Sequence, residues 1–390
     1  GQVLAEDIVA PFSIPPLDNT AMDGYAVIAA DTEGASEERP VTLHVVGELA
    51  AGYVYEGRVE PGTAVRIMTG APMPAGADSI VPFEETDETG FTAPQKTGPL
   101  DTMVRIFKAA KPGNNVRYAG EDVREAETVL TAGTLLRPAQ IGVLASLGMS
   151  RVRVIRRPVV AILSTGDEVL EPGQPRRPGT IYDANSYSVA ALVRRYGGVP
   201  RLLGIAKDTI EDLTAHIRAG LDADLLITSA GVSRGDFDVV KEVLGREGNI
   251  DFHLVNMRPG KPLAFGVFHA GERVVPHIGL PGNPVSSMLV FELFGRPALY
   301  RMLGRPITEK LTVKAIARDR MRMTDARRFY ARCIVTRENG GWVASLTGSQ
   351  SSGVLTSMAR ANGLAVVPEG SPDVQPGDEV TVMILDWEID

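Results

Sequence analysis

Polar loops follow four apolar segments in the middle of the chain, and they hold residue types that bind anions and metal ions. The segment VVAILSTGDEVLEPG (159–173) begins as an apolar run, then breaks into Ser-Thr-Gly and two adjacent acids, Asp167 and Glu168. The four loops are STGDE (164–168), Lys207-Asp208, TSAGVSRGDFD (228–238) and GLPGNPVS (279–286). Ligands bind outside the carboxyl ends of the strands in an open α/β sheet. We therefore expect these loops to line one crevice.

The loops at 228–238 and 279–286 have a composition that suits an anionic ligand. Both are glycine-rich and both open a helix. Glycine lets the backbone approach a ligand closely, and a helix N-terminus presents unpaired N–H groups. Neither loop has the spacing of a Walker A or Rossmann motif, and one such loop alone is more often a plain tight turn. Four polar loops in one crevice favour a ligand site.

Carboxylates accompany these loops, although a carboxylate facing a phosphate is unfavourable unless a cation intervenes. Glu168 and Asp208 are the better candidates for metal binding or acid–base chemistry. Asp238 falls in the first turn of a helix, where an acid complements the dipole and can also hold Mg²⁺ beside a phosphate. We expect Asp236 to cap that helix and Asp167 to orient its own loop.

Positive charge comes from the segment HLVNMRPGKPLAFG (253–266), in which Arg258 and Lys261 flank a Pro-Gly turn. In isolation, a solvated turn with basic flanks is an equally good interpretation. Beside the acids and the glycine-rich loops, an anion clamp is preferable.

The composition excludes several classes of protein. The 390 residues carry a formal net charge of -8, which argues against a general nucleic-acid binder. Cys333 is the one cysteine, so neither a disulfide framework nor a thiolate zinc site can form, and a reducing cytoplasm is expected. No apolar stretch approaches the roughly 20 residues that span a bilayer. The chain opens on Gly1 without a Met, so we expect its natural N-terminus to be missing.

Residues 153–304 alternate strands with helices, which predicts a parallel sheet covered by helices on both faces. One helix should have Asn185 or Ser186 as its N-cap and end at Gly197. A second should open with a capping box of Thr209 and Asp212. The segment 284–304 predicts a helix with Pro284 at its first position.

Two other regions are rich in predicted strands. They are an inserted domain at 23–120 and a C-terminal domain at 305–390, with Pro-Gly turns expected in VEPGTAV (59–65) and VQPGDEV (374–380). The flanks of the insert, 1–22 and 121–152, are expected to form one discontinuous module with a helix at Pro138–Leu147.

Seven motifs occur in the order seen in one protein family. They are DNTAMDGYA (18–26), RIMTGAPMPAGAD (66–78), GEDV (120–123), STGDEVLEPG (164–173), AGVSRGDFD (230–238), RPGKPLAFG (258–266) and GLPGNPVSS (279–287). Over residues 3–385 the chain resembles molybdopterin molybdenumtransferase, the MoeA-type enzyme that is related to the E domain of gephyrin.

The resemblance implies an α/β plus β fold and a specific reaction. The subunit would be multidomain and elongated, with a central molybdopterin-binding α/β domain, a β-rich inserted domain and a small C-terminal β-barrel, and it would form a homodimer. The reaction would take adenylylated molybdopterin and molybdate, depend on Mg²⁺, and yield molybdenum cofactor and AMP. Molybdopterin adenylyltransferase and molybdoenzyme apoproteins are the implied partners; no nucleic acid and no membrane are expected.

The resemblance also implies site residues. The catalytic residues would be Asp23, Thr69, Asp122, Glu168, Asp208 and Asp238, with Glu168 and Asp238 on the metal. The substrate-binding residues would be Ser164, Thr165, Gly166, Ser229, Gly231, Ser233, Gly235, Arg258, Lys261, Pro281, Gly282, Asn283 and Pro284. Because Asp23 and Thr69 lie in the insert, our hypothesis is that the insert reaches the active site of the other subunit.

The chain departs from the family pattern at three positions. Ala230 stands where glycine is more frequent, Leu254 where a basic residue is common, and Arg258 where lysine is frequent. Arginine keeps the charge but presents a planar fork instead of a point charge. Ala230 requires that its backbone position tolerate a Cβ or that the loop shift.

Three alternatives stay open at this point. Related proteins with the central domain alone are adenylyltransferases or nucleotide hydrolases, although these lack the insert and the barrel. A dimeric scaffold without catalysis ranks last, because no long linker or low-complexity tail is present. Tungstate could replace molybdate, since the two oxyanions are nearly identical in size and charge.

Overall fold

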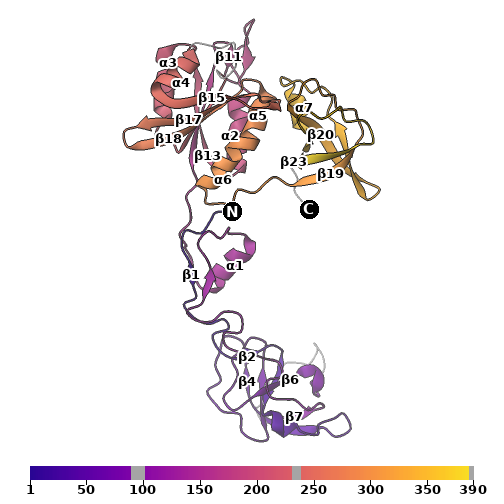
Figure 1. Ribbon diagram of the computed structural model, residues 1–390. Helices are drawn as coiled ribbons and strands as arrows, with labels where there is room; N and C mark the ends of the chain where they lie inside the picture. Colours follow the sequence, from indigo (N-terminus) through magenta and orange to yellow (C-terminus); the bar gives the residue numbers. More distant parts are fainter. Residues whose placement is uncertain (89–101, 231–238, 386–390) are drawn as a thin grey trace. The chain divides into compact units, whose positions relative to one another are not determined.

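The computed structural model describes residues 1–88, 102–230 and 239–385. The chain divides into two compact units, one formed by Leu4–Arg153 and the other by Gly1–Val3 with Val154–Asp390. Figure 1 labels the helices and strands. Across the described ranges, no helix is long and apolar enough to cross a membrane.

The unit Leu4–Arg153 contains a five-stranded sheet in the order β6-β3-β5-β4-β7. Its strands are β3 (Gly24–Val27), β4 (Val41–Leu49), β5 (Thr63–Ile67), β6 (Ser79–Pro82) and β7 (Thr102–Ile106), with short 3-10 helices η1 (Ala29–Thr32) and η2 (Phe83–Glu85). Tyr25 and Val27 enter one apolar core and Ala26 enters another. Successive side chains of a strand point to opposite faces. The sheet is therefore packed on both faces.

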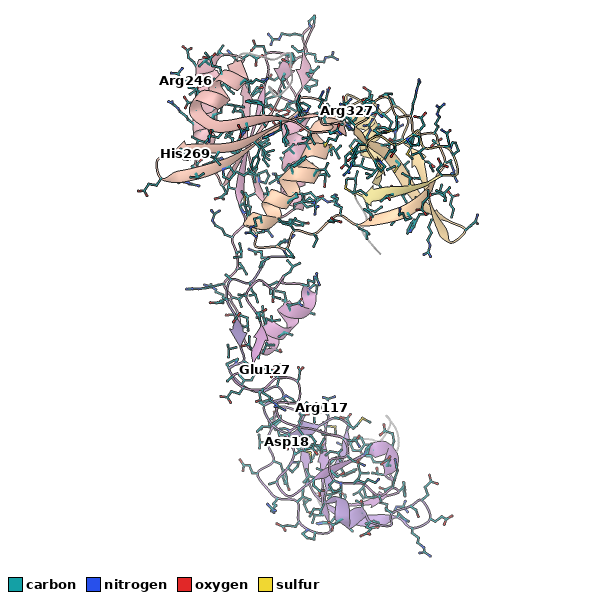
Figure 2. The ribbon with its side chains drawn as sticks, viewed as in Figure 1. Asp18, Arg117, Glu127, Arg246, His269 and Arg327 are labelled. Carbon is teal, nitrogen blue, oxygen red and sulfur yellow. The ribbon has the colours of Figure 1, made fainter. Side chains whose placement is uncertain are left out.

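The same unit contains the segments by which the chain enters and leaves this sheet domain. They are β1 (Ile8–Val9), β2 (Asn19–Thr20), β8 (Val116–Arg117), β9 (Thr128–Leu130) and α1 (Pro138–Ser146). β2 pairs with β8 and β1 pairs with β9, both antiparallel. Asp18 lies on the segment that enters the sheet domain, and Arg117 lies on the segment that leaves it (Figure 2). The two segments are joined by a hydrogen bond from Ala119 N to Asp18 Oδ1 at 2.7 Å. The predicted helix at Pro138–Leu147 is confirmed by α1, whose C-cap is Leu147.

The second unit is built on a six-stranded sheet in the order β13-β10-β14-β18-β17-β15. The strands are β10 (Val159–Thr165), β13 (Val199–Ala206), β14 (Leu225–Ser229), β15 (Gly248–Leu254), β17 (Pro262–Ala270) and β18 (Arg273–Leu280). β13, β10, β14 and β18 are parallel, whereas β17 and β15 are antiparallel to their neighbours. The prediction of a wholly parallel sheet is wrong at this edge. Only Gly271 and Glu272 separate β17 from β18, and a parallel crossover needs a dozen or more residues.

Helices cover both faces of the sheet. They are α2 (Asn185–Arg195), α3 (Ile210–Gly220), α4 (Val239–Glu247), α5 (Pro284–Val290) and α6 (Arg296–Met302). Val160 and Ile162 of β10 enter the core formed with α2, α5 and α6. Ala161 and Leu163 enter the core formed with α3 and α4. This alternation explains the continuous apolar sequence of β10, since a parallel strand buries both of its faces.

The ends of two helices test the predicted caps. Thr209 Oγ1 accepts from Asp212 N at 3.3 Å, so the predicted N-cap of α3 is confirmed. Gly197 follows the C-terminal end of α2 and has a φ of +94°, as predicted for the glycine that ends this helix. The predicted N-cap of α2 is wrong, because Asn185 is already helical and the carboxylate of Asp183 accepts from Ser186 N at 3.0 Å. An aspartate satisfies that N–H, which leaves the amide of Asn185 free for another role.

The segment 284–304 does not form one α-helix. Pro284 is at the first position of α5, as predicted, but a π-helical segment, η3 (Phe291–Gly295), separates α5 from α6. Its Glu292 side chain is buried, at 4% exposure.

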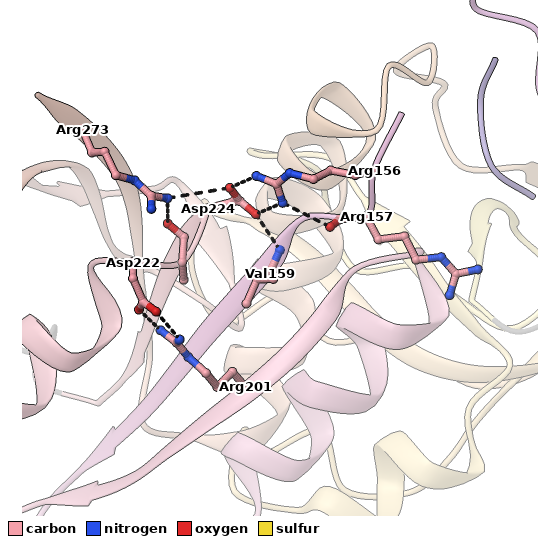
Figure 3. Close-up of polar contacts among 8 residues, drawn as sticks. Arg156, Arg157, Val159, Arg201, Asp222, Asp224 and Arg273 are labelled. Atoms are coloured by element: carbon pink, nitrogen blue, oxygen red, sulfur yellow. Dashed lines mark hydrogen bonds and ion pairs between the residues drawn. The ribbon is translucent and has the colours of Figure 1, made fainter. Parts of the chain in front are cut away.

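Aspartates at the amino ends of the strands align the sheet (Figure 3). Asp224 Oδ2 accepts from Val159 N at 2.8 Å, and the Arg156 guanidinium donates to both oxygens of Asp224, at 2.6 and 2.5 Å. These bonds lower the pKa of Asp224, mainly through Arg156. Arg201 forms a similar pair with Asp222 and lowers its pKa to about 2. The strand ends opposite the crevice are thereby fixed in register.

A closed five-stranded β-barrel follows the α/β domain, as predicted. Its strands are β19 (Thr312–Ala317), β20 (Arg328–Glu338), β21 (Gly341–Leu346), β22 (Gly363–Val367) and β23 (Glu379–Ile384), and α7 (Leu355–Arg360) lies outside them. β20 pairs with both β21 and β22, which closes the sheet. Cys333 is fully buried in the barrel core, and burial raises the pKa of its thiol to about 12. The prediction that it is a core residue is confirmed.

Both predicted Pro-Gly turns are present. Gly62 has a φ of +81° and Gly377 a φ of +94°, each after a proline and before a strand, β5 and β23. A type II turn requires a positive φ at this position, which glycine adopts without a steric penalty.

The barrel and the α/β domain share one apolar core. Alternate residues of β20 face opposite ways, because Ala331 and Cys333 fill the barrel whereas Tyr330 packs outside it, with Leu364, against α2, α5 and α6. The short strand β16 (Met257–Arg258), between β15 and β17, pairs with β20. Arg327 marks this side of the barrel in Figure 2. We call this contact region the seam.

A buried ion pair joins the linker of the barrel to the α/β domain. Lys310 Nζ lies 2.5 Å from Glu292 Oε2, with side-chain exposures of 9% and 4%. Tyr196 Oη lies 2.8 Å from both carboxylate oxygens and 3.0 Å from Lys310 Nζ. Burial lowers the pKa of Lys310, and the Glu292 carboxylate opposes that shift. The charges are buried but paired, so losing one of them should cost more than losing both.

We predict that Lys310→Met lowers the free energy of unfolding by about 3–5 kcal/mol, because it strands the buried charge of Glu292. The double variant Lys310→Met/Glu292→Gln leaves no buried charge and should lose less. Urea unfolding at pH 7 measures both. The coupling would be contradicted if the double variant lowered the free energy of unfolding by the sum of the decreases caused by Lys310→Met alone and by Glu292→Gln alone.

His277 of β18 predicts a pH dependence of stability. It is fully buried, Nε2 lies 3.0 Å from Thr228 Oγ1, and burial lowers its pKa to about 3. Between pH 6.5 and 3 the unfolded chain therefore binds a proton that the folded chain does not, and stability falls as the pH falls. Urea unfolding at several pH values gives the free energy of unfolding as a function of pH. In this window its slope should be steeper for the parent chain than for His277→Gln, by up to about 1.4 kcal/mol per pH unit. Equal slopes would show that His277 does not titrate this way.

Candidate functional site

The predicted loops follow the carboxyl ends of β10, β13, β14 and β18, a region that we call the crevice, and the amide of Asn185 joins two of them. Asn185 Nδ2 lies 2.8 Å from Ser229 Oγ and 2.8 Å from the Gly282 carbonyl oxygen. Ser164 Oγ, at the end of β10, lies 2.8 Å from Ser186 Oγ. Three of the four loops are thus held together through the first turn of α2. The sequence did not single out Asn185 for this role.

The loop after β10 turns sharply at Gly166. Gly166 has a φ of +132°, and a Cβ there would come within 2.6 Å of Glu168 Oε2. Its N–H donates to the Ala206 carbonyl at 3.2 Å, while the side chain of Thr165 is buried. The turn needs glycine because of both its φ and the overlying carboxylate. It leaves Glu168 exposed at the mouth of the crevice.

Two further acids meet at this edge. Asp167 Oδ1 lies 3.4 Å from Asp208 N, and Asp208 Oδ2 lies 3.4 Å from Asp167 N. Each carboxylate thus contacts the backbone of the other loop, and both side chains remain exposed. Among the residues with defined positions, no group of three or more His, Cys, Asp or Glu side chains is arranged to hold a metal ion. Asp238, Gly231, Ser233 and Gly235 lie outside the described residues, so their predicted roles stay predictions.

The backbone of Ala230 has a conformation that favours glycine, the residue that is more frequent at this position. Its φ is +83°, in the left-handed region that L-residues seldom adopt. Its N–H donates to the Leu280 carbonyl at 3.1 Å, and a Cβ on Gly282 would lie 3.5 Å from the Cβ of Ala230. The loop therefore tolerates the extra methyl group at the cost of backbone strain.

The GLPGNPVS loop lies between β18 and α5. Pro281 is buried, Asn283 is the N-cap residue of α5 and Pro284 is its first residue. Val285 N, one residue later, donates to the carbonyl of Ser352 at 3.3 Å. This bond links the loop to the serine-containing segment 347–354 of the barrel domain, across the seam.

The two residues of the predicted anion clamp have different environments. The Arg258 guanidinium donates to Thr324 Oγ1 and to the Arg322 carbonyl, and it lies 3.9 Å from the centre of the Phe329 ring. Burial lowers its pKa. Lys261 is exposed. Arg258 therefore anchors β16 to the barrel, and Lys261 is the cation of the pair that faces solvent.

A buried arginine that the sequence analysis missed lies in the seam. Arg332 of β20 is fully buried on the outer face of the barrel, and burial lowers its pKa to about 10. Its Nε donates to Ser357 Oγ at 2.9 Å, and Nη2 donates to the carbonyls of Ser349 and Ser351, at 2.9 and 3.0 Å. Nη1 is buried without a hydrogen-bond partner. A charged residue inside the apolar strand RRFYARCIV was the signal that could have found it.

An unpaired N–H on a buried cation is unfavourable, and a bound anion would remove that cost. Burial is the one cause of the pKa shift of Arg332, and within the described part of the chain no carboxylate forms an ion pair with it. Ser351 is adjacent to Ser352, whose carbonyl accepts from Val285. The buried guanidinium thus lies one short segment away from the loop that carries Pro281 and Pro284.

The remaining predicted residues are in the unit Leu4–Arg153. Asp23 Oδ1 accepts from both Thr69 N and Thr69 Oγ1, at 2.6 Å each, and these bonds lower the pKa of Asp23. The structure therefore brings these two residues together. Asp122 lines a separate open hollow of ≈ 570 Å³, whose other residues are Gly120, Glu121, Arg124, Glu125, Ala126 and Glu127. Glu127 is labelled in Figure 2.

Three family models match the chain in sequence order. The MoeA N-terminal region (domain I and II) matches residues 1–148, a probable molybdopterin binding domain matches 161–301, and the MoeA C-terminal region (domain IV) matches 314–385.

Individual proteins are similar over nearly the whole chain. Molybdopterin molybdenumtransferase 2 of Mycobacterium tuberculosis is 40% identical over 100% of this chain and 93% of its own length. Molybdopterin molybdenumtransferase of Bacillus subtilis is 34% identical over 98% of this chain and 87% of its own. A crystal structure of the molybdopterin biosynthesis MoeA protein of Pyrococcus horikosii superposes with a TM-score of 0.81, at 32% identity, over 99% of this chain and 92% of that one.

We predict that Ala230→Gly raises the free energy of unfolding by about 0.5–1 kcal/mol, because the left-handed strain it removes exceeds the added freedom of glycine in the unfolded chain. Ala191, an exposed residue inside α2, is the matched control. Ala191→Gly should lower the free energy of unfolding by about 0.5–1 kcal/mol, because glycine is unfavourable inside a helix. Thermal and urea unfolding of both variants make the comparison, and equal losses would show that position 230 is not strained.

Proposed function

This chain belongs to the MoeA family of molybdopterin molybdenumtransferases, and we propose that its substrate is adenylylated molybdopterin. It is a transferase of molybdenum cofactor biosynthesis that inserts molybdenum into molybdopterin. In the proposed reaction, the two dithiolene sulfurs displace oxygen from molybdate as water, water cleaves the bond between the pterin phosphate and AMP, and molybdenum cofactor and AMP leave.

The observation that carries this proposal is the buried, partly unpaired guanidinium beside the crevice. Molybdate is a compact dianion whose oxygens accept hydrogen bonds. In our proposal one of its oxygens accepts from Nη1 of Arg332, which is buried and has no hydrogen-bond partner among the described residues. The low dielectric of the seam strengthens that attraction. Lys261, exposed in the adjoining loop, supplies a second positive charge.

The crevice itself supports binding of the phosphate-bearing substrate. Ser229, Gly282 and the amide of Asn185 present hydrogen-bonding groups at one point. Asn185 Oδ1 is buried without a partner, so it still has an acceptor to offer to a substrate N–H or O–H group. These groups are neutral and fixed by the fold, which suits them to orienting a bound substrate.

The carboxylates at the same edge fit Mg²⁺ by their chemistry. Glu168, Asp167 and Asp208 offer hard oxygen ligands with exposed side chains, and Mg²⁺ binds a few carboxylates together with substrate phosphates. We propose that Glu168 and Asp238 hold the ion and that Asp208 assists. When bound, Mg²⁺ neutralises phosphate charge that these acids would otherwise repel.

We also propose catalytic roles for Asp23, Thr69 and Asp122. The hydrogen bonds from Thr69 stabilise the carboxylate form of Asp23 and lower its pKa, which supports a role in holding a cation. The enzyme would work as a homodimer in the cytoplasm, with the insert of one subunit serving the crevice of its partner. Size-exclusion chromatography with light scattering would test the dimer directly.

The experiment that tests the proposed reaction is the release of AMP from purified adenylylated molybdopterin, with molybdate and Mg²⁺. We predict that Glu168→Gln and Asp238→Asn each lower the rate by about 100-fold or more, as expected when a charge that acts in the chemical step is removed. Glu211→Gln, on the exposed face of α3, is the matched control and should leave the rate unchanged.

Two outcomes would contradict the proposal. Release of AMP that does not need molybdate would indicate a nucleotide hydrolase. Tight binding of the pterin without any release would indicate a carrier or scaffold. Circular dichroism and the oligomeric state of each variant establish that a lost rate is not lost folding.

A further inference from the structure

Two exposed tyrosines converge on one turn at the rim of the crevice. Tyr182 Oη donates to the Gln174 carbonyl at 2.8 Å, and Tyr187 Oη donates to Glu171 Oε2 at 2.9 Å. Gln174 N donates to the Glu171 carbonyl at 3.2 Å, so both hydroxyls are bound to the same turn. The side chains nevertheless stay 42% and 45% exposed.

The backbone places both tyrosines next to residues of the proposed site. Tyr182 belongs to β12 (Ile181–Tyr182), which pairs with β11 (Val169–Leu170), the strand directly after Glu168. The Ile181 N–H donates to the Glu168 carbonyl at 2.9 Å. Tyr187 lies in the first turn of α2, two residues after Asn185. Tyr187 therefore lies on the helix whose first turn joins the crevice loops, and Tyr182 lies on a strand that is hydrogen-bonded to the backbone of Glu168.

Neither ring is explained by packing or by a loose surface position. A tyrosine that serves the core buries its ring, whereas these two rings remain about half exposed although their hydroxyls are fixed. A ring held by its hydroxyl has little conformational entropy left to lose when a ligand stacks on it. A fixed, exposed aromatic ring is suited to receive another planar group.

The turn that holds the tyrosines also carries positive charge. Arg176 and Arg177 follow Gln174 and are both exposed. The backbone of Arg177 is fixed by Thr180, whose Oγ1 accepts from Arg177 N at 3.1 Å and donates to its carbonyl at 2.6 Å. A ligand here would meet aromatic rings beside two guanidinium groups. That combination fits a heterocycle that bears a phosphate.

We propose that Tyr182 and Tyr187 form a stacking platform for a planar heterocycle of the substrate, either its pterin or its purine ring. This inference rests on the proposed function, because it identifies a subsite for the adenylylated pterin. The tyrosines are positioning residues: they hold the ring system at the rim while the phosphates extend toward Glu168 and Asp208.

Equilibrium binding of three probes tests the platform. The probes are AMP, which carries a purine; neopterin, which carries a pterin; and ribose 5-phosphate, which has no ring to stack. Tyr187→Leu and Tyr182→Leu should each weaken binding of AMP or of neopterin by about tenfold, the scale of one lost stacking contact. Weaker binding of AMP by these variants assigns the platform to the purine, and weaker binding of neopterin assigns it to the pterin. Ribose 5-phosphate should bind as in the parent chain.

Three matched variants make the result specific. Tyr187→Phe keeps the ring and should retain most of the affinity, and the pterin fluorescence of bound neopterin should still be quenched. Tyr53→Leu removes a tyrosine that is 70% exposed elsewhere and should change nothing. Thermal melting verifies that each variant is folded.

The proposal is overturned if the leucine variants bind AMP and neopterin as tightly as the parent chain does. It is also overturned if their affinity for ribose 5-phosphate falls equally, or if Tyr187→Phe loses as much affinity as Tyr187→Leu. Failure of the proposed function is a separate result. In that case the parent chain would release no AMP in the presence of molybdate, whatever the tyrosine variants bind.

Discussion

A guanidinium group buried without an ion-pair partner is the constraint on which the arrangement around the site depends. Arg332 faces outward from the barrel and is nevertheless fully buried, so its charge has no contact with solvent. Such a charge requires oxygen acceptors, and the carbonyls of Ser349 and Ser351 with the hydroxyl of Ser357 supply them. The segment 347–357 is thereby fixed, and through Ser352 it contacts the start of α5. The protein leaves Nη1 unpaired, which we interpret as the place of the oxyanion.

The exposed acids of the crevice and the buried cation of the seam lie in different parts of the unit. Acids follow β10 and β13, where Asp167 and Asp208 hold each other's backbone. Cations lie toward the barrel, on Arg332 and Lys261. In our proposal, the phosphates of the substrate lie toward the acids and its dithiolene lies toward Arg332. At the opposite ends of the strands, Asp224 fixes the register that keeps these loops aligned.

Local rules predicted the parts of the fold that neighbouring residues determine. Proline with glycine at 61–62 and 376–377 formed turns, Thr209 capped α3, and Pro284 began α5, because each depends on a few adjacent residues. Long-range packing decided the rest. Arg258 was expected to form an anion clamp with Lys261, but β16 pairs with β20 and the guanidinium of Arg258 lies against the Phe329 ring. Asn185 lost its expected capping role to Asp183 and joined two loops that lie far apart in sequence. Arg332 could not be assigned from its strand alone, since its hydrogen-bond partners lie in a separate segment, at Ser349, Ser351 and Ser357.

Direct binding of molybdate to the purified protein, by equilibrium dialysis with the parent chain and Arg332→Gln, tests the central claim most directly. The account predicts that Arg332→Gln weakens molybdate binding by at least about tenfold, because a charge-assisted hydrogen bond in a buried site is lost. Arg337→Gln, on the exposed part of the same strand, should bind as the parent does. Unchanged affinity in a folded Arg332→Gln variant would show that the oxyanion binds elsewhere.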